Sequence, residues 1–325
     1  MTALSPSDSD ALQALLQKTS RTFALTIPML PQPLRVEIGV AYLLFRIIDT
    51  FEDATAWAPA ERKKALSDFG ALLADDCTDS TARAAAEGWL RRPPVDHDGY
   101  RELLAETPRV LGWYRHLSAP ARAQMRTHVE RSAQGLSRFV DRADAAGVLK
   151  LDTMADLHDY CYVVAGIVGE MLTELFVLGD AHLNGVADQL RARAVAFGEG
   201  LQLVNILKDA NADAVDGRTY LPRQAPLGEV FLLARADLRQ AAEYIETLRA
   251  AGADRGLVAF NALNASLAIA TLRLLRDKGL GSKLTRPQVA GLAAHVAHAL
   301  DVGLPLFDVQ GLGPVRAAAS ESDHV

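Results

Sequence analysis

The carboxylates of one apolar segment have the spacing of a metal-binding site. In the sequence AYLLFRIIDTFEDA, Asp49 and Asp53 are four residues apart and share a face of a helix, with Glu52 beside them. Arg46 lies one turn before Asp49 on the same side. Residues 38–48 are almost all apolar, whereas a solvated surface helix has a polar face. The acids therefore extend from a buried helix. The pattern predicts a carboxylate cluster that faces an internal cavity.

A second acidic stripe lies in LQLVNILKDANADAVDGRTYLP. Asn205, Asp209 and Asp213 follow one another at intervals of four residues, and Gln202 extends the stripe toward the N-terminus. Leucine, valine and isoleucine occupy the positions between these polar residues. We therefore expect a second polar stripe on a helix that is otherwise part of the core.

Two carboxylate clusters in a protein interior repel their own charges and require a cation. Neither cluster contains histidine or cysteine, so a hard ion is favoured, and magnesium takes one or two carboxylates together with phosphate oxygens. We predict that the two helices bind Mg²⁺ and a diphosphate, with Arg46, Lys208 and Arg218 available to neutralise the leaving group. The alternative for either pair alone is a solvated helix face, but two pairs on two apolar helices favour the metal site.

Helical periodicity dominates the chain, and half of its 325 residues are apolar. The expected fold class is all-α, with a single domain over residues 1–325 and a polar tail after about residue 311. The predicted helices are 9–18, 33–55, 59–75, 97–116, 119–145, 152–179, 185–214, 228–251, 254–278 and 286–301.

The composition also excludes several classes of protein. No sustained basic stripe is present, so nucleic acid is not an expected partner. The polar, acidic start does not resemble a signal peptide, and His295, His298 and Asp301 interrupt the most apolar region near the C-terminus, so we expect no membrane anchor. Cys77 and Cys161 have no disulfide or zinc spacing. These features predict a cytoplasmic protein and leave peripheral membrane contact and oligomeric state open; the histidines are assigned no role.

Four motifs resemble those of the squalene and phytoene synthases. They are TSRTFALTIPMLP (Thr19 to Pro31), the two acidic segments, and DYCYVVAGIVGEML (Asp159 to Leu172), in the order of that family. The resemblance covers roughly residues 15 to 280. It implies an isoprenoid synthase fold, a single helical bundle around a central cavity.

The same resemblance implies roles for individual residues. It places magnesium and diphosphate at Asp49, Glu52, Asp53, Asp209 and Asp213. It implies that Arg21, Arg46 and Arg218 contact phosphate, that Phe23 and Tyr42 line the first substrate site, and that Gln202 and Asn205 face the cavity. Lys208 stands where the squalene synthase pattern often has arginine, so its phosphate contact is expected to differ. Tyr160 matches a tyrosine of the first half-reaction, in which its ring could stabilise a cation and its hydroxyl could relay a proton.

The first acidic motif, with Thr50 and Glu52, is more similar to squalene synthases than to phytoene synthases. This implies that two farnesyl diphosphates are joined head to head through presqualene diphosphate, and that NADPH then reduces the product to squalene. The chain has no G-x-G-x-x-G turn, so a nicotinamide would have to bind in the helical cavity.

Three alternatives stay open. A dehydrosqualene or phytoene-type synthase would omit the reduction, and the segment Gly135 to Phe139 departs from the family pattern near the expected pocket. A class I terpene cyclase would use the same spacing of Asn205, Asp209 and Asp213, although the following GRTYLP favours a synthase. A non-catalytic helical scaffold is expected to have lost its acids. Gly166 and Gly169 predict close helix packing or close approach of a prenyl chain.

Overall fold

The computed structural model describes residues 4–144, 148–215 and 219–307. Helices account for the secondary structure of these residues, apart from an isolated bridge between Lys150 and Thr219, and this confirms the predicted all-α class. The helices are α1 (Pro6–Thr19), α2 (Phe23–Thr26), η1 (Ile27–Met29), α3 (Leu34–Glu52), α4 (Pro59–Leu72), α5 (Asp79–Leu90), α6 (Asp98–Ala105), α7 (Thr107–His116), α8 (Ala119–Arg142), α9 (Met154–Cys161), the π-helical η2 (Tyr162–Gly166), α10 (Ile167–Gly179), η3 (Ala181–Val186), α11 (Ala187–Val215), α12 (Leu227–Ala250), α13 (Arg255–Lys278) and α14 (Arg286–Val302).

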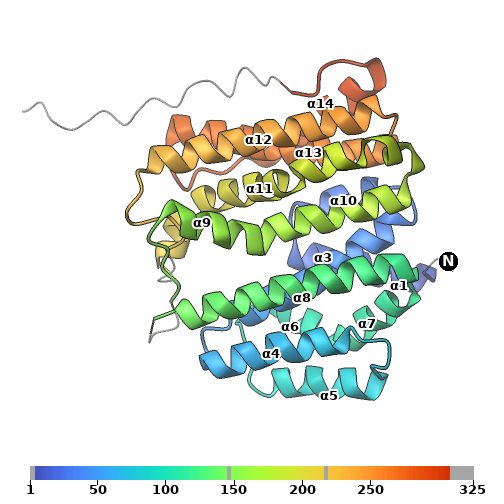
Figure 1. Cartoon of the computed structure of the whole chain (residues 1–325), viewed down its shortest axis with the longest axis vertical. Helices are drawn as coiled ribbons and strands as arrows, with labels where there is room; N and C mark the ends of the chain where they lie inside the picture. Colours follow the sequence, from blue (N-terminus) through green and yellow to red (C-terminus); the bar gives the residue numbers. More distant parts are fainter. Residues whose placement is uncertain (1–3, 145–147, 216–218, 308–325) are drawn as a thin grey trace, which may run out of the picture.

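The long helices lie side by side with nearly parallel axes, and the shorter α4 to α7 gather at one end of the stack (Figure 1). One continuous set of buried apolar side chains joins them, including Leu44 and Ile48 of α3 and Leu203 and Leu207 of α11. Both acidic motifs therefore lie on core helices, as their apolar surroundings predicted.

Two predictions about helix continuity were wrong. The segment 97–116 forms two helices separated at Glu106, because Pro108 lacks the amide hydrogen that would continue the hydrogen bonding of α6, and α7 starts anew at Thr107. The segment 152–179 contains the π-helical turn η2, where the Ser132 hydroxyl donates a 2.9 Å hydrogen bond to the Val163 carbonyl oxygen. Helix α5 had not been predicted.

Two stretches are long and apolar enough to cross a membrane: Met154–Gly179 and Arg255–Lys278. Within the bundle, 44% and 78% of the residues in their most apolar windows are buried. Helix α13 in particular fills the core, with Leu257, Phe260 and Leu263 almost fully enclosed. Length and composition therefore do not distinguish these two stretches from core helices.

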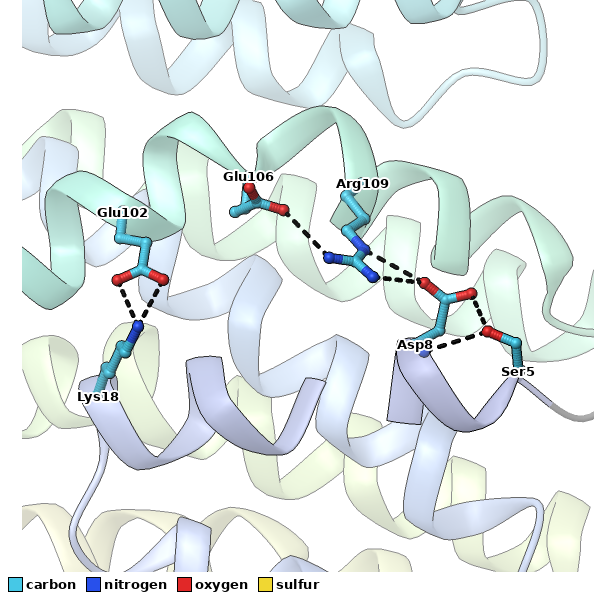
Figure 2. Close-up of polar contacts among 6 residues, drawn as sticks. All are labelled: Ser5, Asp8, Lys18, Glu102, Glu106 and Arg109. Carbon is cyan, nitrogen blue, oxygen red and sulfur yellow. Dashed lines mark hydrogen bonds and ion pairs between the residues drawn. The ribbon is translucent and has the colours of Figure 1, made fainter. Parts of the chain in front are cut away.

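Ion pairs fasten α1 to α6 and α7 (Figure 2). Lys18 Nζ lies 2.6 Å from Glu102 Oε1, and Arg109 Nη2 lies 3.0 Å from Asp8 Oδ1. Ser5, the N-cap of α1, also contacts Asp8 and so supports that carboxylate. Each pair is exposed and individually weak. Together they position the C-terminal end of α1, which opens onto the cavity described below.

Helix α11 crosses the end of η2 and the start of α10 at a pair of glycines. A Cβ atom on Gly169 would lie 2.1 Å from the Ala194 carbonyl oxygen, and one on Gly198 would lie 2.1 Å from the Ala165 carbonyl oxygen. Real atoms do not approach so closely, so only glycine permits this crossing. The close packing predicted for Gly169 is confirmed.

Replacement of Gly198 by alanine is expected to destabilise the fold by about 1–3 kcal/mol, since the helices must separate to admit a methyl group. Urea unfolding followed by circular dichroism measures this difference. The matched control is Gly88→Ala in α5, where an added Cβ meets nothing within 4 Å. Helix propensity predicts that this control gains up to about 1 kcal/mol. Equal behaviour of the two variants would contradict the packing argument.

Candidate active site

A cavity of about 820 Å³ lies inside the bundle. Most of its wall comes from the end of α1, from α2 and α3, from η2 and α10, and from α11 and α13, with further residues from α6 and α12. Part of the wall is apolar, including Val168, Leu172, Phe176 and Phe260, and another part carries charged side chains of α3 and α11. This volume is within the range of roughly 300–1,000 Å³ that is typical of small-molecule sites.

Asp49 faces the cavity from α3 and is close to Arg46. Arg46 Nη1 lies 3.6 Å from Asp49 Oδ2, and Arg46 Nε donates a 3.4 Å hydrogen bond to the Tyr42 hydroxyl. That hydroxyl donates in turn to the Thr19 carbonyl oxygen at 2.7 Å, which ties α3 to the end of α1. Removal from bulk water, helped by the negative charge of Asp53, raises the pKa of Asp49 to about 6 even though Arg46 opposes the shift.

The other acids of this motif lie at the end of α3. Glu52 is buried, and Asp53 is the C-cap residue. The guanidinium of Arg62, itself buried, donates to the Glu52 carbonyl oxygen and places a positive charge at the C-terminus of α3. Neither Glu52 nor Asp53 lines the cavity, whereas Asp49 does.

Asp209 faces the same cavity from α11, where two lysines approach it. Lys208 Nζ lies 3.2 Å from Asp209 Oδ2, and Lys283 Nζ lies 3.2 Å from Asp209 Oδ1. Lys208 also donates a 2.8 Å hydrogen bond to Asn205 Oδ1. Lys283 belongs to the connection between α13 and α14, which the Asn211 side chain fastens to α11 by a 3.1 Å hydrogen bond to the Leu280 carbonyl oxygen. Two lysine side chains therefore place positive charge beside Asp209 of the second acidic cluster.

Among the described residues, no three carboxylate, histidine or cysteine side chains converge on one point in the manner of a complete metal site. The donor chemistry nevertheless fits magnesium, which takes few protein carboxylates and completes its shell with phosphate and water. Asp49 supports this fit, because burial raises its pKa and a bound cation would stabilise its ionised form.

Nine residues predicted for the site line this one cavity: Arg21, Phe23, Tyr42, Arg46, Asp49, Gln202, Asn205, Lys208 and Asp209. Glu52, Asp53, Tyr160 and Asp213 do not line it, although all four have interactions with neighbouring residues. Arg218 lies outside the described residues.

Tyr160 is buried beside the end of α3, and its side chain is only 5% exposed. Its ring stacks on Tyr220 at 4.9 Å between centroids and meets Phe139 edge-on at 5.2 Å. Burial raises the pKa of Tyr160 well above its usual value, and the charges of Glu52, Tyr220 and Asp53 add to this. Tyr160 is therefore a neutral phenol in a negatively charged environment.

Several residues of the cavity wall were not predicted from the sequence, and three of them lie beside the charged residues of the site. Lys283 is distant in the chain from both acidic motifs, and Tyr100 and His97 belong to the start of α6, far from either motif. Arg46 Cζ lies 5.4 Å from the centroid of the Tyr100 ring. A lone lysine in a loop or a lone tyrosine in a short helix gives no sequence signal, so only the fold could identify them.

Comparisons with known proteins agree with this architecture. The profile of the squalene/phytoene synthase family matches residues 16–228. The squalene synthase of Cyberlindnera jadinii is 33% identical over 215 residues, and squalene synthase ERG9 of Candida albicans is 30% identical over 210 residues. Each of these matches covers 65% of this chain and 44% of the relative.

Solved structures extend the similarity to most of the chain. The complex of TcSQS with E5700 has a TM-score of 0.75 at 26% identity and covers 91% of this chain and 89% of that one. The complex of TcSQS with BPH1237 has a TM-score of 0.74 at 27% identity, with coverages of 90% and 86%. A dehydrosqualene synthase at 19% identity, with a TM-score of 0.54, shares the fold.

The chain is thus an isoprenoid synthase by fold, and it belongs to the squalene/phytoene synthase family. The four sequence motifs had predicted this family, and the prediction is confirmed. The matches to the curated relatives span less than half of the relatives' own length.

Proposed function

We propose that this protein is a squalene synthase. It joins two molecules of farnesyl diphosphate head to head through presqualene diphosphate and then reduces this intermediate to squalene with NADPH. The observation that carries the proposal is that Asp49 of α3 and Asp209 of α11 line one cavity, part of whose wall is apolar. The similarity to the squalene synthases of Candida albicans and Cyberlindnera jadinii supports it.

The charged end of the cavity would bind the diphosphate. Asp49 and Asp209 would hold magnesium, with Glu52, Asp53 and Asp213 proposed to complete the two clusters. Bound magnesium would neutralise the diphosphate and so make it a better leaving group. Arg46, Lys208 and Arg21 would contact phosphate oxygens directly, and Arg218 is proposed to do the same. Lys283 adds a cation that is already 3.2 Å from Asp209.

The apolar wall would bind the prenyl chains and exclude water from the carbocations. Phe23, Leu172, Phe176 and Phe260 present apolar or aromatic surface to the cavity. Aromatic ring faces stabilise nearby cations, and a dry wall protects them from hydrolysis. Tyr42 would take part in the same substrate site, and Gln202 and Asn205 would orient the substrate from α11.

Tyr160 is proposed to act in the first half-reaction. Because its pKa is raised, its hydroxyl keeps its proton and can receive and pass on a proton only in concert with a neighbour. Tyr220, which is hydrogen-bonded to Tyr160, is such a neighbour. The carboxylates of Glu52 and Asp53 would favour a positive charge near the phenol.

The same proposal includes the use of NADPH as the reductant and a cytoplasmic location with peripheral membrane contact. It also includes the organisation of the chain as a single domain. The reductant would supply a hydride to the second cation, and the exposed cations Arg21 and Lys283 at the cavity could pair with its phosphates. The acidic net charge of −6 gives no reason to expect a nucleic acid partner.

Incubation of the purified chain with farnesyl diphosphate and Mg²⁺, with and without NADPH, tests the function. Mass spectrometry of the extracted products should find squalene only when NADPH is present. A C30 product with one more double bond in both reactions would identify a dehydrosqualene synthase. A cyclised C15 product would identify a terpene cyclase and overturn the proposal. Absence of any product from an otherwise folded chain would favour a scaffold.

A further inference from the structure

The Arg46 guanidinium lies over two tyrosine rings at the charged end of the cavity. Its Cζ is 5.6 Å from the centroid of the Tyr42 ring and 5.4 Å from that of the Tyr100 ring. Tyr42 precedes Arg46 by one turn of α3, whereas Tyr100 comes from α6. Arg46 is also 3.6 Å from Asp49, so these contacts direct its charge toward the first acidic cluster.

The position of Tyr100 is fixed by the end of α1. A Cβ atom on Gly99 would lie 2.5 Å from the Lys18 carbonyl oxygen, so the start of α6 packs directly on the backbone of α1. The ion pair between Lys18 and Glu102, at 2.6 Å, joins the same two helices (Figure 2). On α6 itself, the His97 ring stacks on Tyr100 at 4.1 Å between centroids. Tyr100 is thus a rigid support and not a mobile surface ring.

A free arginine side chain loses much rotamer freedom when it binds an anion. A ring that already holds the guanidinium reduces this loss, because the electrostatic attraction between the cation and the ring face fixes the orientation in advance. Burial raises the pKa of the Tyr100 hydroxyl, so the ring remains neutral beside Arg46.

We propose that Tyr100 is a positioning residue of the diphosphate site, and that its ring acts through Arg46. This inference rests on the proposed function, since it assumes that Arg46 binds a diphosphate. It assigns a role to α6 and extends the site beyond the two acidic motifs. The proposed role requires the face of the ring. Phenylalanine at this position should therefore preserve the role of Tyr100, and leucine should not.

Inorganic diphosphate with Mg²⁺ is a suitable probe, because it requires neither a prenyl chain nor a reductant. Isothermal titration calorimetry should give roughly tenfold weaker binding for Tyr100→Leu and a change of less than about twofold for Tyr100→Phe. In steady-state assays, Tyr100→Leu should raise the KM for the prenyl diphosphate more than it lowers kcat. A double-mutant cycle with Arg46→Met should find no further loss from Tyr100→Leu when the guanidinium is already absent.

The binding results distinguish a failure of the positioning role of Tyr100 from a failure of the proposed function. If wild-type protein binds diphosphate and Tyr100→Leu binds it equally well, the positioning role is overturned while the proposed function stands. An equal loss for Tyr100→Phe and Tyr100→Leu would assign the effect to the hydroxyl and also overturn it. If wild-type protein binds no diphosphate with Mg²⁺, the proposed function itself fails, and this inference fails with it.

Discussion

Replacement of Asp209 by asparagine is expected to lower product formation from farnesyl diphosphate by roughly 10³-fold, and Asp49→Asn should have an effect of similar size. Each change keeps the shape of the side chain and removes one negative charge that would hold the metal. At Asp209 it also leaves Lys208 and Lys283 without the carboxylate that now lies 3.2 Å from each. Steady-state kinetics with product extraction measure the loss.

Asp68→Asn is the matched control for this prediction. Asp68 is an exposed acid of α4 that pairs with Lys64 one turn away, and it lies outside the cavity. Its loss should change activity by less than twofold, since exposed pairs contribute little. Full activity of Asp49→Asn and Asp209→Asn alike would contradict the metal–diphosphate site and would revive the interpretation of this chain as a scaffold.

The parts of the site that could be predicted from the sequence are those encoded locally. Asp49 and Asp209 each lie on a helix whose remaining surface is apolar, and such a pattern can only be buried with its polar face toward a cavity. Gly169 could be predicted for a similar reason, because glycine inside an apolar helix is unfavourable unless another backbone approaches it. The family motifs then supplied the pairing of the two helices.

The remaining residues depend on contacts between distant parts of the chain. Lys283 reaches Asp209 only because Asn211 fastens its loop to α11. Tyr100 reaches Arg46 only because α6 packs on the end of α1. No periodicity encodes such contacts. The same limitation explains why Glu52 was expected beside Asp49 in the cavity, whereas it is buried at the end of α3 and does not line the cavity.

A buried pair of acids behind the cavity wall was likewise not predicted. Glu199 of α11 and Asp237 of α12 are only 3% and 8% exposed. Burial raises the pKa of Glu199 to about 7, and burial together with the charge of Glu199 raises that of Asp237 to about 7. His158 of α9 lies beside this pair, with its Nε2 3.3 Å from Glu199 Oε2 and its side chain 58% exposed. One oxygen of each acid has no hydrogen-bond partner in the described structure.

Glu199→Gln is therefore expected to stabilise the protein at pH 8 by about 3 kcal/mol and to lose this advantage by about pH 4.5. In the unfolded chain Glu199 ionises near its ordinary pKa of 4.5, whereas in the folded chain it keeps its proton up to about pH 7. The folded state is thus penalised progressively as the pH rises between these values. Urea unfolding at a series of pH values measures the difference, with Glu246→Gln, an exposed acid of α12 paired with Arg249, as the control. A gain that does not depend on pH would show that the pKa of Glu199 is the same in the folded and the unfolded chain, and a loss of stability near neutral pH would show that Glu199 is ionised in the fold; either result would contradict the prediction.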